Sequence, residues 1–159
     1  MIIMGIDPGT AKTGYGIIEV KENPNPMSLI DYGRILTSKD NLMSERLLKI
    51  YTSSTELVKK FSPDIIVIER LFFNTNVKTA LSVGQARGIH VLVAGQFRLP
   101  VFEYTALEAK MALTGYGRSE KEAVREKVAE YLGKDILKKK GIDASDALAM
   151  AICHQIKIS

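Results

Sequence analysis

Short apolar runs bounded by turn residues alternate along this chain with longer segments of helical periodicity. The short runs predict five β-strands, at residues 2–6, 14–20, 29–36, 64–69 and 101–104. Apolar residues at helical spacing predict five helices, at about residues 42–61, 77–97, 106–113, 120–132 and 143–154. Ser119 and Glu122 are spaced as a capping box for the fourth of these helices.

The order of these elements predicts an α/β fold. Short turns join the first three strands, which indicates an antiparallel meander. The fourth strand follows a helix, and a helical crossover returns the chain parallel to a neighbouring strand. We therefore expect a five-stranded mixed sheet with helices on both faces, formed by a single domain over residues 1–159. The first and fourth strands would be central and adjacent, so that both end at the same edge of the sheet.

Four carboxylates stand at the ends of apolar segments. Asp7 ends the first strand, Glu69 ends the fourth, and Asp143 and Asp146 open the apolar run 147–153. Carboxylates that converge repel one another unless cations lie between them, and their oxygen atoms suit Mg²⁺ or Mn²⁺. A pair of such ions about 4 Å apart hydrolyses phosphodiester bonds. The pattern therefore indicates a metal-dependent nuclease.

Each acid also has a simpler interpretation. Asp7-Pro8-Gly9 forms a good turn by itself, and Glu69 could reach solvent from a strand end. Asp143 and Asp146 would favour the dipole at the start of a helix. The glycines around Asp7 are also similar to the phosphate-holding turn of actin-like sugar kinases and chaperone ATPases, but those enzymes close two domains on a nucleotide. The nuclease interpretation accounts for all four acids together, because a mixed sheet could bring them to one place.

The charge of the chain points toward a polyanion. The net charge is +4, and the excess lies in residues 110–140, which hold nine Lys or Arg against five Asp or Glu. Such a segment could contact a nucleic acid or could be a solvated helix face. Within it, Lys110 and Lys121 are candidate phosphate ligands or transition-state stabilisers. Phe72 and Phe73, which closely follow Glu69, are either core residues or aromatics that stack on bases.

The cysteine count and the lengths of the apolar runs bear on where the protein works in the cell. Cys153 is the only cysteine, which rules out an intrachain disulfide, and with His90 and His154 it gives no zinc spacing. The longest apolar runs are too short to span a membrane, and the N-terminus lacks the basic flank of a signal peptide. We expect a cytoplasmic protein.

Seven ordered blocks of sequence resemble the RuvC family, the bacterial Holliday-junction resolvases, over nearly the whole chain. The blocks are Gly5-Ile6-Asp7-Pro8-Gly9 with Thr13-Gly14-Tyr15-Gly16, Ile68-Glu69 with Phe72, Gly84-Gln85-Ala86-Arg87-Gly88, Pro100-Val101-Phe102-Glu103-Tyr104, Lys110, Gly115-Tyr116-Gly117 with Lys121, and Asp143-Ala144-Ser145-Asp146-Ala147-Leu148-Ala149. The run Lys138-Lys139-Lys140 departs from the family pattern, and its role is open.

The resemblance implies an RNase H-like fold, a homodimer and two Mg²⁺ ions per active site, for which Mn²⁺ could substitute. The four metal ligands implied by the family fall on Asp7, Glu69, Asp143 and Asp146. The aromatic residue that contacts the junction falls on Phe72, and the supporting catalytic lysines fall on Lys110 and Lys121. We also expect DNA contacts from Phe73, Arg87 and Arg118.

The implied function is the resolution of four-way DNA junctions in homologous recombination and DNA repair. Two symmetric strands would be nicked by two-metal-ion phosphodiester hydrolysis, with the branch-migration proteins RuvA and RuvB as partners. Two alternatives stay open. One is a junction-binding protein that does not cleave, although a binder needs no anionic cluster facing phosphates. The other is a YqgF-type nuclease of the same fold that acts on RNA, although such proteins are typically shorter.

Overall fold

The computed structural model describes residues 1–22, 27–71, 77–133 and 144–159. Its five strands form one sheet in the order β3-β2-β1-β4-β5. The strands are β1 (Ile2–Asp7), β2 (Lys12–Val20), β3 (Met27–Leu36), β4 (Ile65–Glu69) and β5 (Val101–Tyr104). The described helices are α1 (Met43–Phe61), α2 (Val77–Gln96), α3 (Ala106–Thr114), α4 (Lys121–Leu132) and α6 (Ser145–Ile158).

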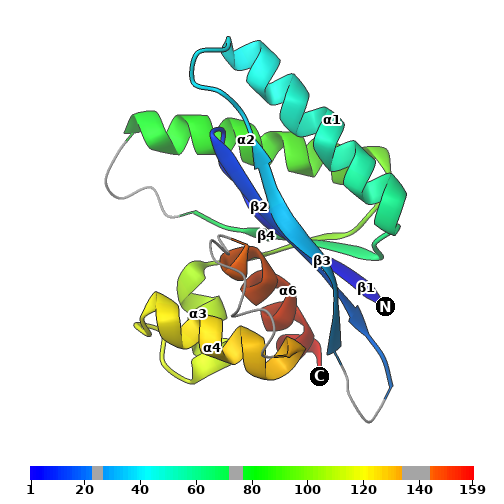
Figure 1. Cartoon of the computed structure of the whole chain (residues 1–159), viewed down its shortest axis with the longest axis vertical. Helices are drawn as coiled ribbons and strands as arrows, with labels where there is room; N and C mark the ends of the chain where they lie inside the picture. The colour runs from blue at the N-terminus through cyan, green and yellow to red at the C-terminus, as the bar shows by residue number, and fades with distance from the viewer. Residues whose placement is uncertain (23–26, 72–76, 134–143) are drawn as a thin grey trace.

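The sheet is mixed and is covered on both faces, as the order of elements predicts. Strands β1, β2 and β3 pair antiparallel, whereas β1 pairs parallel with β4, and β4 with β5. Helices α1 and α2 lie on one face, and α3, α4 and α6 lie on the other (Figure 1). In the register of β1 and β4, Ile6 stands beside Ile68, so these two strands end next to each other.

Side-chain alternation decides which way the strand ends point. Ile3 of β1 and Val67 of β4 belong to the core under α6, whereas Met4 and Ile68 belong to the core under α1 and α2. Successive side chains of a strand point to opposite faces, so residues two apart share a face. Asp7 and Glu69 therefore point to the face that α6 covers.

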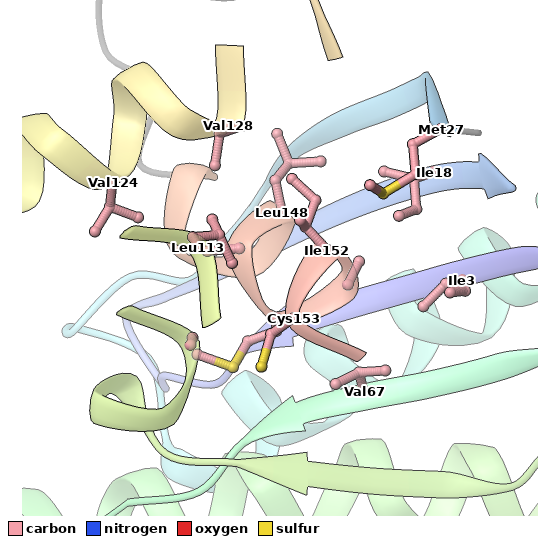
Figure 2. Close-up of a cluster of buried hydrophobic side chains, with 14 of the residues drawn as sticks. Ile3, Ile18, Met27, Val67, Leu113, Val124, Val128, Leu148, Ile152 and Cys153 are labelled. Carbon is pink, nitrogen blue, oxygen red and sulfur yellow. The ribbon is translucent and has the colours of Figure 1, made fainter. Parts of the chain in front are cut away.

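Helix α6 is the centre of the core on this face. All residues from Ala147 to His154 are buried, as expected for a helix that is surrounded by protein on every side. Leu148 and Ile152 pack toward Ile3 and Ile18 of the sheet and toward helix α4 (Figure 2). The burial fixes the position of α6 and hence of the polar residues in its first turn.

Two glycines allow α6 to approach the sheet closely. Gly5 of β1 and Gly16 of β2 are direct partners in the antiparallel register. A Cβ atom on Gly5 would lie 1.9 Å from the backbone oxygen of Ala147, and one on Gly16 would lie 2.5 Å from a side-chain carbon of Leu148. Any side chain at these positions would push α6 away from the sheet. The glycines therefore set the distance between the strand ends and the start of α6.

The structure corrects the predicted N-terminal cap of α4. Ser119 and Glu122 do not form a capping box, because α4 begins one residue later than expected, with Glu120 at its N-cap and no side-chain capping bond there. The hydroxyl of Ser119 instead donates to the carbonyl oxygen of Tyr116, 2.7 Å away, within the preceding turn. The Ser119 hydroxyl is therefore used within the turn and does not cap α4.

Within the described part of the chain, none of the helices combines the length and apolar character that crossing a bilayer requires.

Candidate active site

Three of the four predicted acids converge at one edge of the sheet. Asp7 and Glu69 end the adjacent parallel strands β1 and β4, and Asp146 is the second residue of α6, which lies over the same face. The turn after Asp7 is held by Thr13, whose hydroxyl donates to the carbonyl oxygen of Gly9 at 2.8 Å. The fourth predicted acid, Asp143, lies outside the described residues.

Asp7 and Glu69 share a hydrogen bond. Burial and then the negative charge of Asp7 raise the pKa of Glu69 from its ordinary value of 4.5 to about 8. Burial also raises the pKa of Asp7, although the hydrogen bond from Glu69 acts in the opposite direction. In the absence of a cation the pair is therefore expected to hold one proton near neutral pH, with protonated Glu69 donating to the Asp7 carboxylate. The charge of Asp146 adds to the repulsion at both groups.

Lys121 brings a positive charge to all three acids. Its Nζ atom lies 3.1 Å from Oδ2 of Asp146, and its charge lowers the pKa of both Asp7 and Glu69. Lys121 is the first residue of α4, so the packing of α4 against α6 decides its position.

A cavity of about 200 Å³ opens beside the acids. Glu69, Asp146, Lys110 and Lys121 line it, together with small and apolar residues of α3, α4 and α6. Lys110 is carried by α3, which begins with a capping box. In that box Glu108 N–H donates to the Thr105 hydroxyl at 3.1 Å, and Thr105 N–H donates to the Glu108 carboxylate at 2.8 Å. Two acids and two lysines thus face one cavity.

The donor set fits divalent cations that prefer oxygen. Asp7, Glu69 and Asp146 offer carboxylate oxygens only. The raised pKa values of Asp7 and Glu69 mark a site with more negative charge than Lys121 neutralises. Across residues 1–22, 27–71, 77–133 and 144–159, however, no three Asp, Glu, His or Cys side chains are grouped as the ligands of one ion. The three described acids therefore fit a metal site by their chemistry rather than as an assembled set of ligands.

Neither Arg87 nor Arg118 is among the residues that line the cavity. Arg87 lies on α2 and forms an ion pair of 2.6 Å with Glu103 of β5, and α2 covers the opposite face of the sheet (Figure 1). Arg118 is exposed in the turn between α3 and α4. Phe72 and Phe73 lie outside the described residues. The roles of these four residues in DNA binding stay predictions.

The two histidines are core residues. His90 is buried, and its Nδ1 atom lies 3.1 Å from the hydroxyl of Ser54. His154 is buried as well, with Nδ1 at 2.9 Å from the hydroxyl of Tyr104. Neither histidine is placed at the acids.

Sequence reasoning missed Lys12. Its charge lowers the pKa of Asp7, because β2 begins at Lys12 rather than at Gly14 and continues antiparallel to β1 from the end where Asp7 lies. The available signal was the short connection between the two strands, which must bring the first residues of β2 near the last residue of β1.

A mixed sheet in this order, with carboxylates at the ends of its two central parallel strands and a third on the covering helix, defines the RNase H-like class of nucleases. Comparison with known proteins makes the assignment specific. The model of the RuvC family, described as "Crossover junction endodeoxyribonuclease RuvC", matches residues 3–154. The chain belongs to the RuvC family, whose nucleases are metal-dependent, and it is a crossover junction endodeoxyribonuclease.

Individual relatives agree with this assignment. The RuvC of Ruminiclostridium cellulolyticum is 49% identical over 154 residues, which cover 97% of this chain and 91% of that protein. The RuvC of Caldicellulosiruptor saccharolyticus is 45% identical over 159 residues, covering 100% and 95% of the two chains. The structure of Thermus thermophilus RuvC in complex with a Holliday junction superposes with a TM-score of 0.90 at 31% identity and covers 99% of this chain and 94% of that chain.

Proposed function

We propose that this protein resolves four-way DNA junctions by hydrolysing one phosphodiester bond in each of two symmetric strands, with divalent cations held by its acidic cluster. The observation that carries the proposal is the pairing of Asp7 with Glu69. Burial raises the pKa of both carboxylates, and the charge of Asp7 raises that of Glu69 further. Buried carboxylates that repel each other lower the stability of the folded protein, and a bound cation would remove the repulsion.

Asp7, Glu69 and Asp146 would hold the cations, and Asp143 is the fourth ligand expected from the sequence. Two Mg²⁺ ions, or Mn²⁺ in their place, would supply an activated water and would stabilise negative charge on the phosphate and on the departing oxygen. Lys110 and Lys121 line the same cavity as Glu69 and Asp146. We expect their ammonium groups to bind the phosphate and to offset the charge that develops on it.

The direct test compares a synthetic four-way junction with a linear duplex of the same sequence, each with Mg²⁺ and with a chelator. We expect paired nicks in the junction only, and only with the metal. Asp7→Asn should keep junction affinity and lose cleavage, because an amide cannot replace a carboxylate as a ligand shared between cations. Near-normal cutting by Asp7→Asn would refute the metal assignment, and cutting of RNA in preference to the junction would support the YqgF-type alternative.

We further propose a homodimer that is built on α2. One side of this helix carries apolar and glycine residues at alternating intervals of four and three, the spacing of a coiled-coil seam. The residues are Val77, Leu81, Gly84, Gly88, Val91 and Gly95. Val77 is 86% exposed and Leu81 is 68% exposed, which is unusual for large apolar residues on one helix face.

The glycines of this seam support the dimer independently. A Cβ atom at Gly84, Gly88 or Gly95 would meet no atom of the described residues within 4 Å. Packing within the described chain therefore does not require glycine at these positions, whereas a second helix that crosses closely does. A two-fold axis that relates two copies of α2 would give a dimer with two active sites, which the cutting of two symmetric strands needs.

The dimer is tested by sedimentation equilibrium. Leu81→Asp should give a monomer and should uncouple the two nicks, because a charge cannot be buried unpaired in the seam. Leu48→Asp, on the exposed side of α1, is the matched control and should stay dimeric. A wild-type monomer at all concentrations would refute the proposal.

The remaining proposals follow from the family alone. Phe72 would insert at the crossover, and Phe72→Ala should slow junction cleavage while the fold is kept. RuvA and RuvB would deliver the junction, and the protein would act in the cytoplasm. Co-sedimentation with purified RuvA and RuvB on a junction is the test of partnership.

A further inference from the structure

The turn between α3 and α4 displays a tyrosine to solvent. Gly115 ends α3 in the left-handed conformation, with φ of 76°, and Tyr116 follows it. The side chain of Tyr116 is 60% exposed. A single exposed tyrosine is common on protein surfaces, so the interest of Tyr116 lies in the residues around it.

The backbone of this turn is held firmly. The N–H of Tyr116 donates to the Thr114 hydroxyl at 3.1 Å, and its carbonyl oxygen accepts from the Ser119 N–H at 3.1 Å and from the Ser119 hydroxyl at 2.7 Å. The hydroxyls of Thr114 and Ser119 lie 2.7 Å apart. Backbone atoms and two small side chains make all of these bonds. These bonds hold the backbone at Tyr116 without depending on its ring.

The turn is also tied to the active site. It joins α3, which carries Lys110, to α4, which begins at Lys121. The Thr114 hydroxyl lies 2.7 Å from the carbonyl oxygen of Lys110, so the helical turn that bears Lys110 is bonded to the turn that bears Tyr116. Arg118 is exposed two residues further on. The turn thus connects the two helices that carry Lys110 and Lys121, the lysines that line the cavity beside the acids.

We propose that Tyr116 stacks on a DNA base next to the phosphate that is cut, holds the strand in position and biases which sequences are cut. The inference rests on the proposed junction cleavage and adds a DNA-contacting residue to it. Cations that track a backbone, combined with an aromatic ring that accepts a base, are how proteins bind unpaired nucleotides. A four-way junction offers bases at its crossover that can leave the stack, whereas an intact duplex does not.

Leu107 and Met111 of α3 are also exposed, and a Cβ atom on Gly117 would lie 3.1 Å from Leu107. These residues could give the turn an apolar surface for a protein partner instead. Lys110 and Lys121 at the cavity and Arg118 in the turn favour DNA, because positive side chains attract the phosphate backbone. A double-mutant cycle between the protein and the DNA separates the two interpretations.

The experiment is a double-mutant cycle between the protein and the DNA. Single-turnover cleavage is measured for wild type and Tyr116→Ala, on junctions that carry one abasic nucleotide at successive positions around the nick. On the intact junction we expect Tyr116→Ala to cut about tenfold more slowly and Tyr116→Phe to cut at nearly the normal rate, because the stacking ring is kept. At the contacted position the abasic site should slow wild type by a similar factor and should slow Tyr116→Ala no further.

Two controls complete the design. The thermal midpoint of Tyr116→Ala should equal that of wild type, because the turn is held by other groups. Tyr131→Ala, at the far end of α4, removes another exposed tyrosine ring and should cut at the normal rate.

The results distinguish a failure of the stacking contact from a failure of the nuclease function. Independent effects of Tyr116→Ala and of the abasic site at every position, or an unchanged rate for Tyr116→Ala, would overturn the inference while leaving the nuclease function intact. A wild-type protein that cuts no junction with Mg²⁺ or Mn²⁺ would overturn the proposed function and the inference with it. Coupling confined to one position would support the stacking contact.

Discussion

Replacing Glu69 by glutamine should stabilise the metal-free protein at alkaline pH. Burial and Asp7 raise the pKa of Glu69 from 4.5 to about 8 in the folded state, whereas the unfolded chain has the ordinary value. Between these two values the folded protein binds more protons, so its stability falls as pH rises from about 4.5 to about 8 and stays low above that. Glutamine cannot ionise, and its amide can still donate to the Asp7 carboxylate.

The shift sets the size of the effect. One unit of pKa corresponds to about 1.4 kcal/mol. Asp7 and Glu69 titrate together, so the full shift does not count for Glu69 alone. We expect Glu69→Gln to raise the free energy of unfolding by roughly 2–4 kcal/mol at about pH 9 and to leave it almost unchanged at about pH 4. Urea unfolding in the presence of a chelator, at both pH values, measures the difference. Glu126→Gln, on the exposed side of α4, removes one charge elsewhere and should change stability by less than about 0.5 kcal/mol.

Metal binding gives an independent check of the same reasoning. Saturating Mg²⁺ should stabilise wild type at alkaline pH more than it stabilises Glu69→Gln, because ligands that bind only the folded state raise its stability. Parallel pH profiles of unfolding for wild type and Glu69→Gln would refute the account of the paired carboxylates. The variant should also fail to cleave, so that stability is gained where activity is lost.

Three further predictions follow from other contacts. Lys121→Ala should slow cleavage about 100-fold while weakening junction affinity much less, because it removes a charge that stands beside the acids. Single-turnover rates and affinities measured side by side test this. Gly5→Ala should lower the free energy of unfolding by at least about 1–3 kcal/mol and should slow cleavage too, since the added Cβ collides with the backbone of α6. Thermal unfolding measures the loss of stability. Burial lowers the pKa of His90 to about 4, so stability should fall by about 3 kcal/mol as pH drops from 6.5 to 4, and His90→Gln should remove this loss in acid unfolding curves.

Much of the architecture and the outline of the site could be read from the sequence. The apolar run before Asp7 and the one before Glu69 had to be strands, and the helix between the first three strands and the fourth strand had to return the chain parallel. The two strands and the parallel connection between them predict from sequence alone that Asp7 and Glu69 lie side by side. The position of Lys121 at the start of a helix also followed from periodicity, although the expected cap at Ser119 was wrong.

Contacts between segments distant in the chain were decided by the tertiary structure. The sharing of a proton by Asp7 and Glu69 depends on burial under α6, and that burial depends on glycines at 5 and 16 that are opposite each other in the sheet. The ion pair of Arg87 with Glu103 and the pairing of Lys121 with Asp146 each join two elements, so no local pattern announces them. The physical reason is that strand and helix periodicity are properties of neighbouring residues, whereas pKa values and ion pairs depend on the distances and the solvent exclusion that packing creates.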